Sequence, residues 1–407
     1  MVLEKLKSLT GSQQEAISKL RKYKVGALFM EQGTGKTRTA IELVNSTDCD
    51  FVLYIAPYRV INPDGEVESV VDEVERWGGF NVPVSYLGVE SLSNSDRIYL
   101  EYRDELKRYK RPFIVVDESI KIKNLEANRT QRVLDLGRFS YYRLVLNGTP
   151  ITRNLLDLYA QMYFLSPKIL GMKLNQFKYT FCRIKTVTKR YGNKTKKNEF
   201  ITGYENIDYL YSLISNYVYE CQLRLNVKAN HIKVTYNIED KEEYSSLKSY
   251  YLNENMMIKM NNQIFMQMTQ SMQRSYSLDE GKIAVMDDLV KRVNQEKTLI
   301  FCKYIDSREF CEKRYPKCLV LSYQKSSLGL NLQEYNTIIY FDKIWDYYLV
   351  EQSKSRIYRQ GQEDDCTYYY LTGNIGLDKL IDKNIKKKVG MAEYFKKINI
   401  NNLNKEL

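Results

Sequence analysis

The sequence has no long apolar run and no leader-like start, and each absence removes a class of protein. No stretch of about 18 apolar residues occurs, so we expect no membrane-spanning helix. The first residues, MVLEKLKSLTGSQQ, lack the basic-then-apolar pattern of a secretion signal. We therefore expect a cytoplasmic protein with no membrane partner.

Histidine is almost absent, and the cysteines are not paired. The seven cysteines are scattered, odd in number and never spaced as CxxC, which favours reduced thiols in a reducing compartment. The single histidine, His231, has no cysteine or histidine at ligand spacing. A zinc site is therefore not expected, and we interpret His231 as a structural or surface residue.

Length and charge set the broad class. A chain of 407 residues is long enough for two or three domains with a sizeable core. Lys and Arg outnumber Asp and Glu by 62 to 50, which gives a formal net charge of +12. This surplus favours a polyanionic partner. A solvated basic surface would give the same count, so charge alone leaves both interpretations open.

Short apolar runs alternate with amphipathic stretches near both ends of the chain. Nearly continuous apolar strands separated by helices predict parallel sheets covered on both faces. The expected fold class is therefore α/β, with two parallel-sheet lobes. The strand-like runs are 25–30, 51–57, 112–118 and 142–150 in the first lobe, and 297–304, 317–323, 336–343 and 367–373 in the second.

The middle of the chain follows neither pattern. Residues 183–204 predict a basic hairpin that turns at 191–193, and residues 240–275 show helical spacing. We place the lobe boundary near 225–230. The predicted domains are a first lobe at 1–227, with a hairpin and helical insertion at about 168–227, and a second lobe at 228–407, with a helical linker at about 238–282, a core at 283–390 and a tail.

The stretch MEQGTGKT, residues 30–37, lies between an apolar strand and an amphipathic helix. Glycines let backbone N–H groups approach a phosphate closely, Lys36 would reach the β- and γ-phosphates, and the Thr37 hydroxyl would bind Mg²⁺. A glycine-rich turn with a chance lysine is the alternative, which the strand-loop-helix context disfavours. The predicted nucleotide contacts are Gln32, Gly33, Thr34, Gly35, Lys36, Thr37 and Arg38.

An acidic pair follows another apolar strand, in VVDES. Parallel sheets present catalytic groups at such strand ends. Asp117 would hold Mg²⁺, and Glu118 would act as general base toward the attacking water. Gln13 precedes the glycine loop on an expected helix, where its amide either reads the adenine edge or lies at the surface.

Gln352, Arg356 and Arg359 lie in EQSKSRIYRQGQ. On a helix these positions share one face, at i, i+4 and i+7. Two arginines on one face can meet a triphosphate as arginine fingers and stabilise charge in the transition state. An ordinary basic helix face is the alternative.

Seven segments follow one another along nearly the whole chain, and together they resemble helicase superfamily two. Within it they resemble the Swi/Snf-type double-strand DNA translocases, in a minimal phage-type form. The segments are SLTGSQQEAI, MEQGTGKT, LYIAPYRVI, VVDESIKIKN, LNGTPITRNLLDLYAQMYFLSP, SYQKSSLGLNL and YFDKIWDYYLVEQSKSRIYRQGQ.

The resemblance implies two RecA-like lobes with ATP and Mg²⁺ in a cleft between them and a nucleic-acid strand crossing both. It departs from the family at Ile120, where many relatives have histidine, so the contact from this motif to the rest of the cleft is expected to be rewired. Ser326 and Ser327 replace two glycines. Almost no sequence separates KRYP from KCLVLSY, so the second lobe is expected to be trimmed.

The implied activity is ATP-dependent translocation on double-stranded or branched DNA. The composition and compact size suit a phage or mobile-element gene in a bacterial host, acting with replication or recombination proteins. A strand-separating DNA or RNA helicase and an ATP-switched DNA clamp stay open as alternatives. The expected nucleic-acid contacts are Pro57, Thr149, Ser322, Ser326 and Ser327 by resemblance, and Lys194, Lys196 and Lys197 of the basic hairpin, which could also be a solvated surface.

Overall fold

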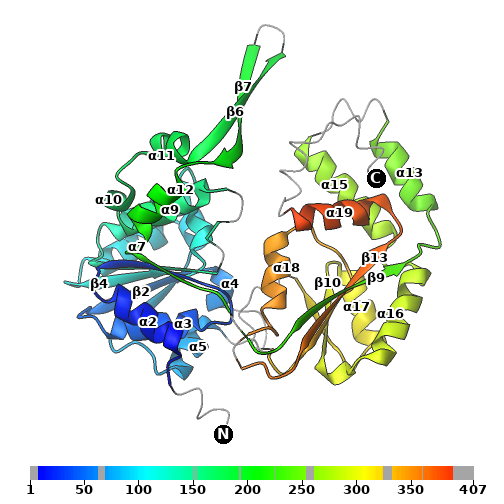
Figure 1. The fold of residues 1–407 in the computed structure, drawn as a ribbon, viewed down its shortest axis with the longest axis horizontal. Coiled ribbons are helices and arrows are strands. Elements are labelled where there is room, and N and C mark those ends of the chain that lie inside the picture. The colour runs from blue at the N-terminus through cyan, green and yellow to red at the C-terminus, as the bar shows by residue number, and fades with distance from the viewer. Residues whose placement is uncertain are drawn as a thin grey trace. The chain divides into compact units, whose positions relative to one another are not determined.

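The chain divides into two compact units, Met1–Leu223 and Arg224–Leu407, each built on its own parallel sheet (Figure 1). Helices pack on both faces of each sheet, and the α/β class expected from the sequence is confirmed. Within the described residues, no helix is long and apolar enough to cross a bilayer. This computed structural model describes residues 8–62, 69–148, 150–151, 154–191, 194–223, 225–253, 261–323, 332–359 and 361–387.

The sheet of unit 1 has six parallel strands in the order β3-β2-β4-β5-β1-β8. Alternate residues of each central strand enter different cores, as where Leu53 and Tyr54 of β2 lie on opposite faces. Burial on both faces explains the continuous apolar runs in the sequence. The strands are β1 Val25–Met30, β2 Phe51–Ala56, β3 Val84–Gly88, β4 Pro112–Val116, β5 Tyr142–Asn147 and β8 Val218–Cys221.

Helices cover both faces of this sheet. One core includes residues of α2 Gly11–Leu20, α3 Lys36–Asn45 and α5 Val70–Arg76, with α4 Tyr58–Ile61 at its edge. The other core includes residues of α6 Ser91–Asn94, α7 Asp96–Leu106, the 3₁₀ helix η1 Ser119–Ile122, α8 Asn128–Gly137, α9 Leu156–Leu165, α10 Pro167–Leu170, α11 Leu174–Phe181 and α12 Ile207–Ile214.

Strands β2, β4, β5 and β1 are consecutive neighbours and all run parallel. Their carboxyl ends therefore meet at the same edge of the sheet, which is where α/β folds bind ligands. The loops that leave this edge begin at Pro57 after β2, Asp117 after β4, Gly148 after β5 and Glu31 after β1. Residues far apart in the sequence are gathered here by topology alone.

The segment expected as an insertion has two different parts. Strands β6 Cys182–Tyr191 and β7 Lys194–Tyr204 form the antiparallel hairpin, with Tyr191 paired to Lys194 in the register. Strand β8, which follows, pairs in parallel with β1 and belongs to the main sheet. Sequence reasoning missed β8 because VYEC is short and only its first residue is buried, and it missed β3, three of whose five residues are only partly buried.

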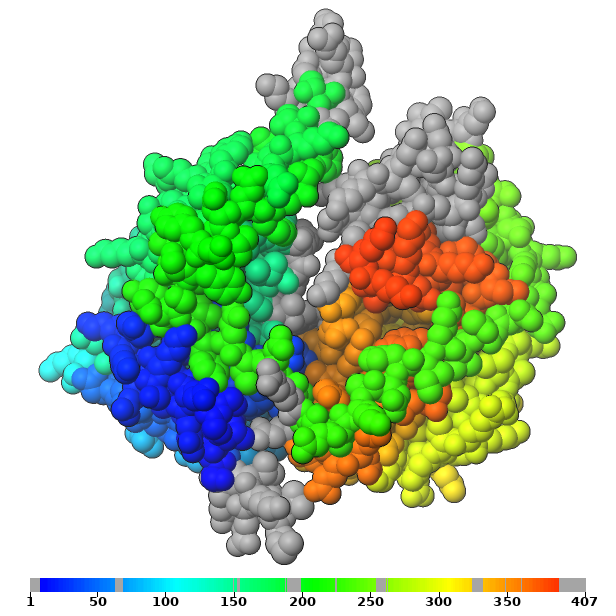
Figure 2. All heavy atoms as spheres, viewed as in Figure 1, coloured from blue at the N-terminus to red at the C-terminus, as the bar shows by residue number. Residues whose placement is uncertain are grey.

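The sheet of unit 2 has five parallel strands in the order β11-β10-β12-β13-β9. Sequence reasoning missed β9, an edge strand with mostly exposed residues, which lies at the surface in Figure 2. His231 of β9 stacks on Tyr368, with ring centroids 4.9 Å apart, so its role is structural. The strands are β9 Ala229–Tyr236, β10 Thr298–Cys302, β11 Leu319–Ser322, β12 Thr337–Tyr340 and β13 Cys366–Gly373.

The methionine-rich stretch of unit 2 packs inside the fold. Met268 and Met272 of α15 are fully buried, in one core with Phe265. The helix α17 ends at Arg314 and β11 begins at Leu319, so only a short turn joins them. The helices of this unit are α13 Glu242–Tyr251, α15 Asn262–Ser275, α16 Glu280–Arg292, α17 Ile305–Arg314, α18 Tyr347–Lys354 and α19 Gly376–Lys386.

Unit 2 also buries an ion pair beside its sheet. Lys282 Nζ lies 2.9 Å from Asp342 Oδ1, and the two side chains are 3% and 2% exposed. The ammonium also donates to the Ser277 carbonyl at 2.8 Å, and Asp342 Oδ2 accepts from the Lys303 backbone N–H at 2.9 Å. Because each charge has further hydrogen-bond partners, the pair satisfies the conditions under which buried ions are tolerated.

Candidate nucleotide site

The glycine loop between β1 and α3 has the backbone that its sequence requires. Gly33 and Gly35 have φ angles of 84° and 79°, in the left-handed region that favours glycine. Thr34 closes the turn, since its N–H and its hydroxyl both donate to the Glu31 carbonyl, at 3.3 and 2.6 Å. Gly35 is the N-cap of α3, and no side chain caps this helix. The first-turn amides therefore face the position where a phosphate would bind.

Gln13 braces this loop from α2. Its side chain is 3% exposed, and Nε2 donates to the carbonyls of Thr34 at 3.2 Å and Gly35 at 3.4 Å. Oε1 accepts from the Thr10 backbone N–H at 2.9 Å. Both ends of the amide are therefore engaged within the protein, and Gln13 is not a surface residue. A role in reading adenine stays a prediction.

The acidic pair follows β4, which β5 separates from β1 in the sheet, and its two residues are half-buried. Asp117 accepts from the Tyr54 hydroxyl at 3.1 Å and from the Glu118 N–H at 2.8 Å. Burial raises the pKa of Asp117 to about 7, Glu118 adds to the rise, and the positive charge of Lys36 opposes it. Glu118 has φ 47° and ψ 50°, a left-handed conformation that costs a non-glycine residue about 1–3 kcal/mol.

Helix α5 contributes residues that sequence reasoning missed. The Thr37 hydroxyl donates to Glu73 Oε2 at 3.2 Å, and the guanidinium of Arg38 lies 4.5 Å from the centre of the Trp77 ring. Glu73 and Trp77 are four residues apart, so one face of α5 contacts two successive residues of the loop and helix. The sequence signal that could have found them is the spacing of Glu73 and Trp77 in VVDEVERW, an acid and an aromatic residue four positions apart.

The residues at this edge fit a magnesium nucleotide. Hydroxyl and carboxylate oxygens, here from Thr37 and Asp117, are the ligands that Mg²⁺ prefers. In the part of the chain that the structure describes, no group of three His, Cys, Asp or Glu residues could hold a metal by itself.

In unit 2 the three predicted residues do not share one helix, and this prediction was wrong. Helix α18 ends at Lys354, so only Gln352 lies within it. Gln352 is 5% exposed, and its Oε1 accepts no hydrogen bond from any residue that the structure describes. Arg356 is 9% exposed, whereas Arg359 is half-buried.

Beyond the end of α18, other segments bond to backbone carbonyls that a longer helix would use. The Leu332 N–H donates to the Arg356 carbonyl at 3.3 Å, and Gln362 Nε2 donates to the Ile357 carbonyl at 3.1 Å. A carbonyl that already accepts a hydrogen bond from another segment is less able to accept the helical bond from the N–H four residues later. Arg356 and Arg359 are therefore positioned by turns, whose partners a helical pattern does not reveal.

The expected nucleic-acid contacts are only partly described. Pro57 is buried at the start of α4, and Ser322 is the last residue of β11. The other expected contacts lie outside the described residues, or have side chains that do: Thr149, Ser326 and Ser327, and the side chains of Lys194, Lys196 and Lys197.

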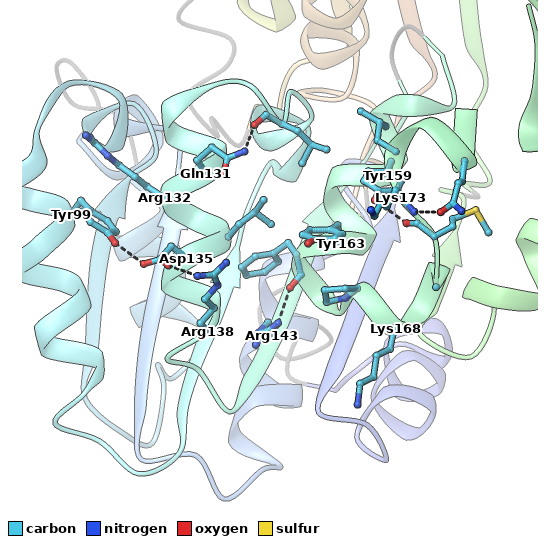
Figure 3. Close-up of a pocket in the computed structure, with 18 residues that line it drawn as sticks. Tyr99, Gln131, Arg132, Asp135, Arg138, Arg143, Tyr159, Tyr163, Lys168 and Lys173 are labelled. Atoms are coloured by element: carbon cyan, nitrogen blue, oxygen red, sulfur yellow. Dashed lines mark hydrogen bonds and ion pairs between the residues drawn. The ribbon is translucent and has the colours of Figure 1, made fainter. Parts of the chain in front are cut away.

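A depression of about 1220 Å³ opens over α8, α9 and α11 of unit 1 (Figure 3). None of the predicted nucleotide residues lines it. Its arginines are used within the fold: Arg138 pairs with Asp135 at 3.2 Å, and Arg143 donates to the Phe164 carbonyl at 3.1 Å. This depression is therefore separate from the candidate nucleotide site.

Two parallel α/β units, the first with a glycine loop after β1 and an acidic pair after β4, define a protein with two RecA-like lobes. The sequence matches the SNF2-related domain over residues 84–315, more than half of the chain. The chain belongs to the SNF2-related family, and the resemblance to Swi/Snf-type members of helicase superfamily two is confirmed.

Known relatives match parts of longer proteins. An uncharacterized ATP-dependent helicase of Mycoplasma pneumoniae is 24% identical over 420 residues, covering 90% of this chain and 40% of the relative. Helicase SWR1 of Mycosarcoma maydis is 32% identical over 160 residues, covering 35% of this chain and 8% of the relative. The chain thus spans well under half the length of these curated relatives.

A similar solved structure is the Sulfolobus solfataricus SWI2/SNF2 ATPase core in complex with dsDNA. It is 19% identical, with a TM-score of 0.42, over 92% of this chain and 90% of that chain.

Proposed function

We propose that this chain is an ATP-driven motor that translocates on or remodels double-stranded DNA. The observation that carries the proposal is the gathering of Lys36, Thr37, Asp117 and Glu118 at one edge of the unit 1 sheet, in a chain of the SNF2-related family. Three properties of that edge support ATP hydrolysis: an uncapped helix start, a half-buried acid whose pKa is raised by burial and lowered by Lys36, and a strained Glu118.

Each residue has a role in this proposal. The loop amides and Lys36 bind the phosphates, and Thr37 and Asp117 hold Mg²⁺, which when bound neutralises charge on the β- and γ-phosphates. Glu118 accepts a proton from the attacking water. Arg356 and Arg359 stabilise charge that develops on the transferred phosphoryl group, so that turnover depends on both units.

The proposed partner is double-stranded or branched DNA. A net charge of +12 favours a polyanion, and phosphate contacts of this kind are tolerant of sequence and sensitive to salt. We propose a setting in phage or mobile-element replication or recombination, in the cytoplasm of a bacterial host. Strand separation is the second candidate, favoured by a relative over 90% of the chain that is named an ATP-dependent helicase.

The ATPase rate with duplex DNA, single-stranded DNA and RNA tests the partner. Stimulation by duplex DNA is expected, and stimulation by RNA alone would overturn the DNA assignment. A triplex-displacement assay and a forked-duplex unwinding assay then separate the activities. Displacement without unwinding supports translocation, an opened fork supports a helicase, and ATP-dependent binding with neither outcome indicates an ATP-switched clamp.

A further inference from the structure

A buried amide in α9 has no place in the nucleotide chemistry described above. Gln161 is fully buried, and its neighbours Ala160 and Met162 are fully buried apolar residues. Burying an amide costs free energy unless its hydrogen bonds are made. A glutamine here therefore needs partners inside the fold.

The partners of Gln161 occupy the hydrogen-bonding positions of both its amide oxygen and its amide nitrogen. Oε1 accepts from the Ser119 hydroxyl at 2.6 Å and from Asn147 Nδ2 at 3.4 Å. Nε2 donates to the carbonyls of Pro150 and Asp157, both at 2.8 Å. Two acceptor and two donor positions are all that a glutamine amide has. Ser119 and Asn147 are fully buried as well, so these side chains form a polar network inside the fold.

The network joins three places that matter to the proposed motor. Ser119 directly follows Glu118, the predicted general base. Asn147 precedes Gly148, which packs on the glycine loop: a β-carbon at Gly148 would lie 3.2 Å from Gln32 Cγ and 3.5 Å from Lys36 Nζ. Gln161 thus bonds to the residue after Glu118 and to the residue before Gly148.

The bond to the Pro150 carbonyl leads away from the phosphate site. Pro150 directly follows Thr149, the residue expected to contact nucleic acid. Gln161 Nε2 donates to the Pro150 carbonyl, so one side chain bonds both next to the predicted general base and next to the expected nucleic-acid contact. Ile120, the residue after Ser119, is 7% exposed and its side chain has no polar group. That side chain cannot bond to Gln161, and the Ser119 hydroxyl makes that bond instead.

We propose that Gln161 is a positioning residue that couples the nucleotide site to the nucleic-acid-binding loop. Its amide keeps Ser119, Asn147 and the Pro150 carbonyl in one arrangement, so a shift at Glu118 is transmitted to the loop that carries Thr149. Coupling is reciprocal: DNA changes nucleotide affinity by the same factor by which nucleotide changes DNA affinity. This inference rests on the proposed function.

The test measures that factor directly. Duplex DNA affinity is determined by fluorescence anisotropy with and without a non-hydrolysable ATP analogue, and the ratio of the two dissociation constants is the coupling factor. For the unaltered chain we expect a factor of about 5 to 150. Gln161→Met and Ser119→Ala should each bring it below about 2, a change that a purely structural role of the network would not produce.

Two further variants make the result specific. Gln176→Met removes an exposed amide whose oxygen accepts from the Lys173 backbone N–H, and it should leave the factor unchanged. In Ser119→Ala/Gln161→Met both partners of the 2.6 Å bond are removed, so the double variant should lose little more coupling than either single variant. Ser119→Ala deletes one hydroxyl, and a thermal melt verifies that it folds.

The failures are distinguishable. If the unaltered chain shows no change in DNA affinity on binding the analogue, the proposed motor function and this inference fall together. If the unaltered chain is coupled and both Ser119→Ala and Gln161→Met keep the full factor, Gln161 is not the coupling residue, and the proposed function stands.

Discussion

Both sheets bury polar groups beside their strands, but the groups differ in kind. Unit 1 buries the neutral network around Gln161, and unit 2 buries the ion pair of Lys282 and Asp342. A neutral network can rearrange without leaving a charge uncompensated, whereas a broken ion pair leaves one charge in the protein interior. We infer that breaking the ion pair would cost unit 2 more free energy of unfolding than breaking one bond of the network would cost unit 1.

The largest effect on ATP turnover is expected when one positive charge is removed, either Lys36 of unit 1 or Arg359 of unit 2. Lys36→Ala should abolish both nucleotide binding and hydrolysis, because the phosphates lose their cation.

Arg359→Ala should spare nucleotide binding and lower DNA-stimulated kcat by about 10³-fold, as expected when an arginine finger is removed. Nucleotide-binding fluorescence and steady-state ATPase rates measure the two effects. Substantial turnover in Lys36→Ala, or unchanged stimulation in Arg359→Ala, would reject the corresponding role.

The stability of unit 2 should be the next most sensitive property. Lys282→Met leaves Asp342 buried without its cation, so the free energy of unfolding should fall by about 3–5 kcal/mol. Urea denaturation followed by circular dichroism measures this decrease. The matched control is Lys297→Met. Its partner Asp364 is 47% exposed, so loss of this ion pair should lower the free energy of unfolding far less. Equal decreases in the two variants would remove the contrast between the units.

Glu73 provides a smaller test within unit 1. Because the Thr37 hydroxyl donates to this carboxylate, Glu73→Gln should raise the Mg²⁺ concentration needed for nucleotide binding by about 10-fold, as for other residues that orient metal ligands. Binding of a fluorescent ATP analogue is titrated with Mg²⁺ in the Glu118→Gln background, so hydrolysis does not contribute. Glu75→Gln on the same helix is the control, and an unchanged Mg²⁺ requirement in Glu73→Gln would dismiss this role.

The smallest effect is expected at the hairpin. Replacing Lys194, Lys196 and Lys197 by glutamine should weaken DNA binding modestly. The slope of log affinity against log salt should fall by about 1 for each DNA phosphate that a lysine no longer neutralises. Anisotropy titrations between low and physiological salt measure the slope. A slope equal to that of the unaltered chain would mean that the hairpin is a solvated surface.

Where sequence reasoning succeeded, it relied on patterns confined to a few neighbouring residues. The apolar runs predicted all of the central strands, because a strand buried on both faces has almost no polar positions. It missed β3, β8 and β9, which lie at or near sheet edges and are partly exposed. Exposure on one face breaks the apolar run by which a strand is recognised.

Sequence reasoning failed where a residue's environment comes from a distant segment. The repeat of Gln352, Arg356 and Arg359 is helical in the sequence, yet α18 ends at Lys354. Beyond it, Leu332 and Gln362 bond to backbone carbonyls that a longer helix would use. Glu73 was overlooked for the same reason, since its contact with Thr37 joins residues 36 positions apart.

The sequence by itself determined the two-lobe α/β class, the glycine loop and the acidic pair at Asp117, because strand burial and loop chemistry are written in adjacent residues. The tertiary structure alone decided which buried polar groups meet. Ser119 and Gln161 are 42 residues apart, and their bond exists only because η1 and α9 pack together at the end of the unit 1 sheet. A buried amide must find its partners within the fold, and only the packing of distant elements determines which partners are within reach.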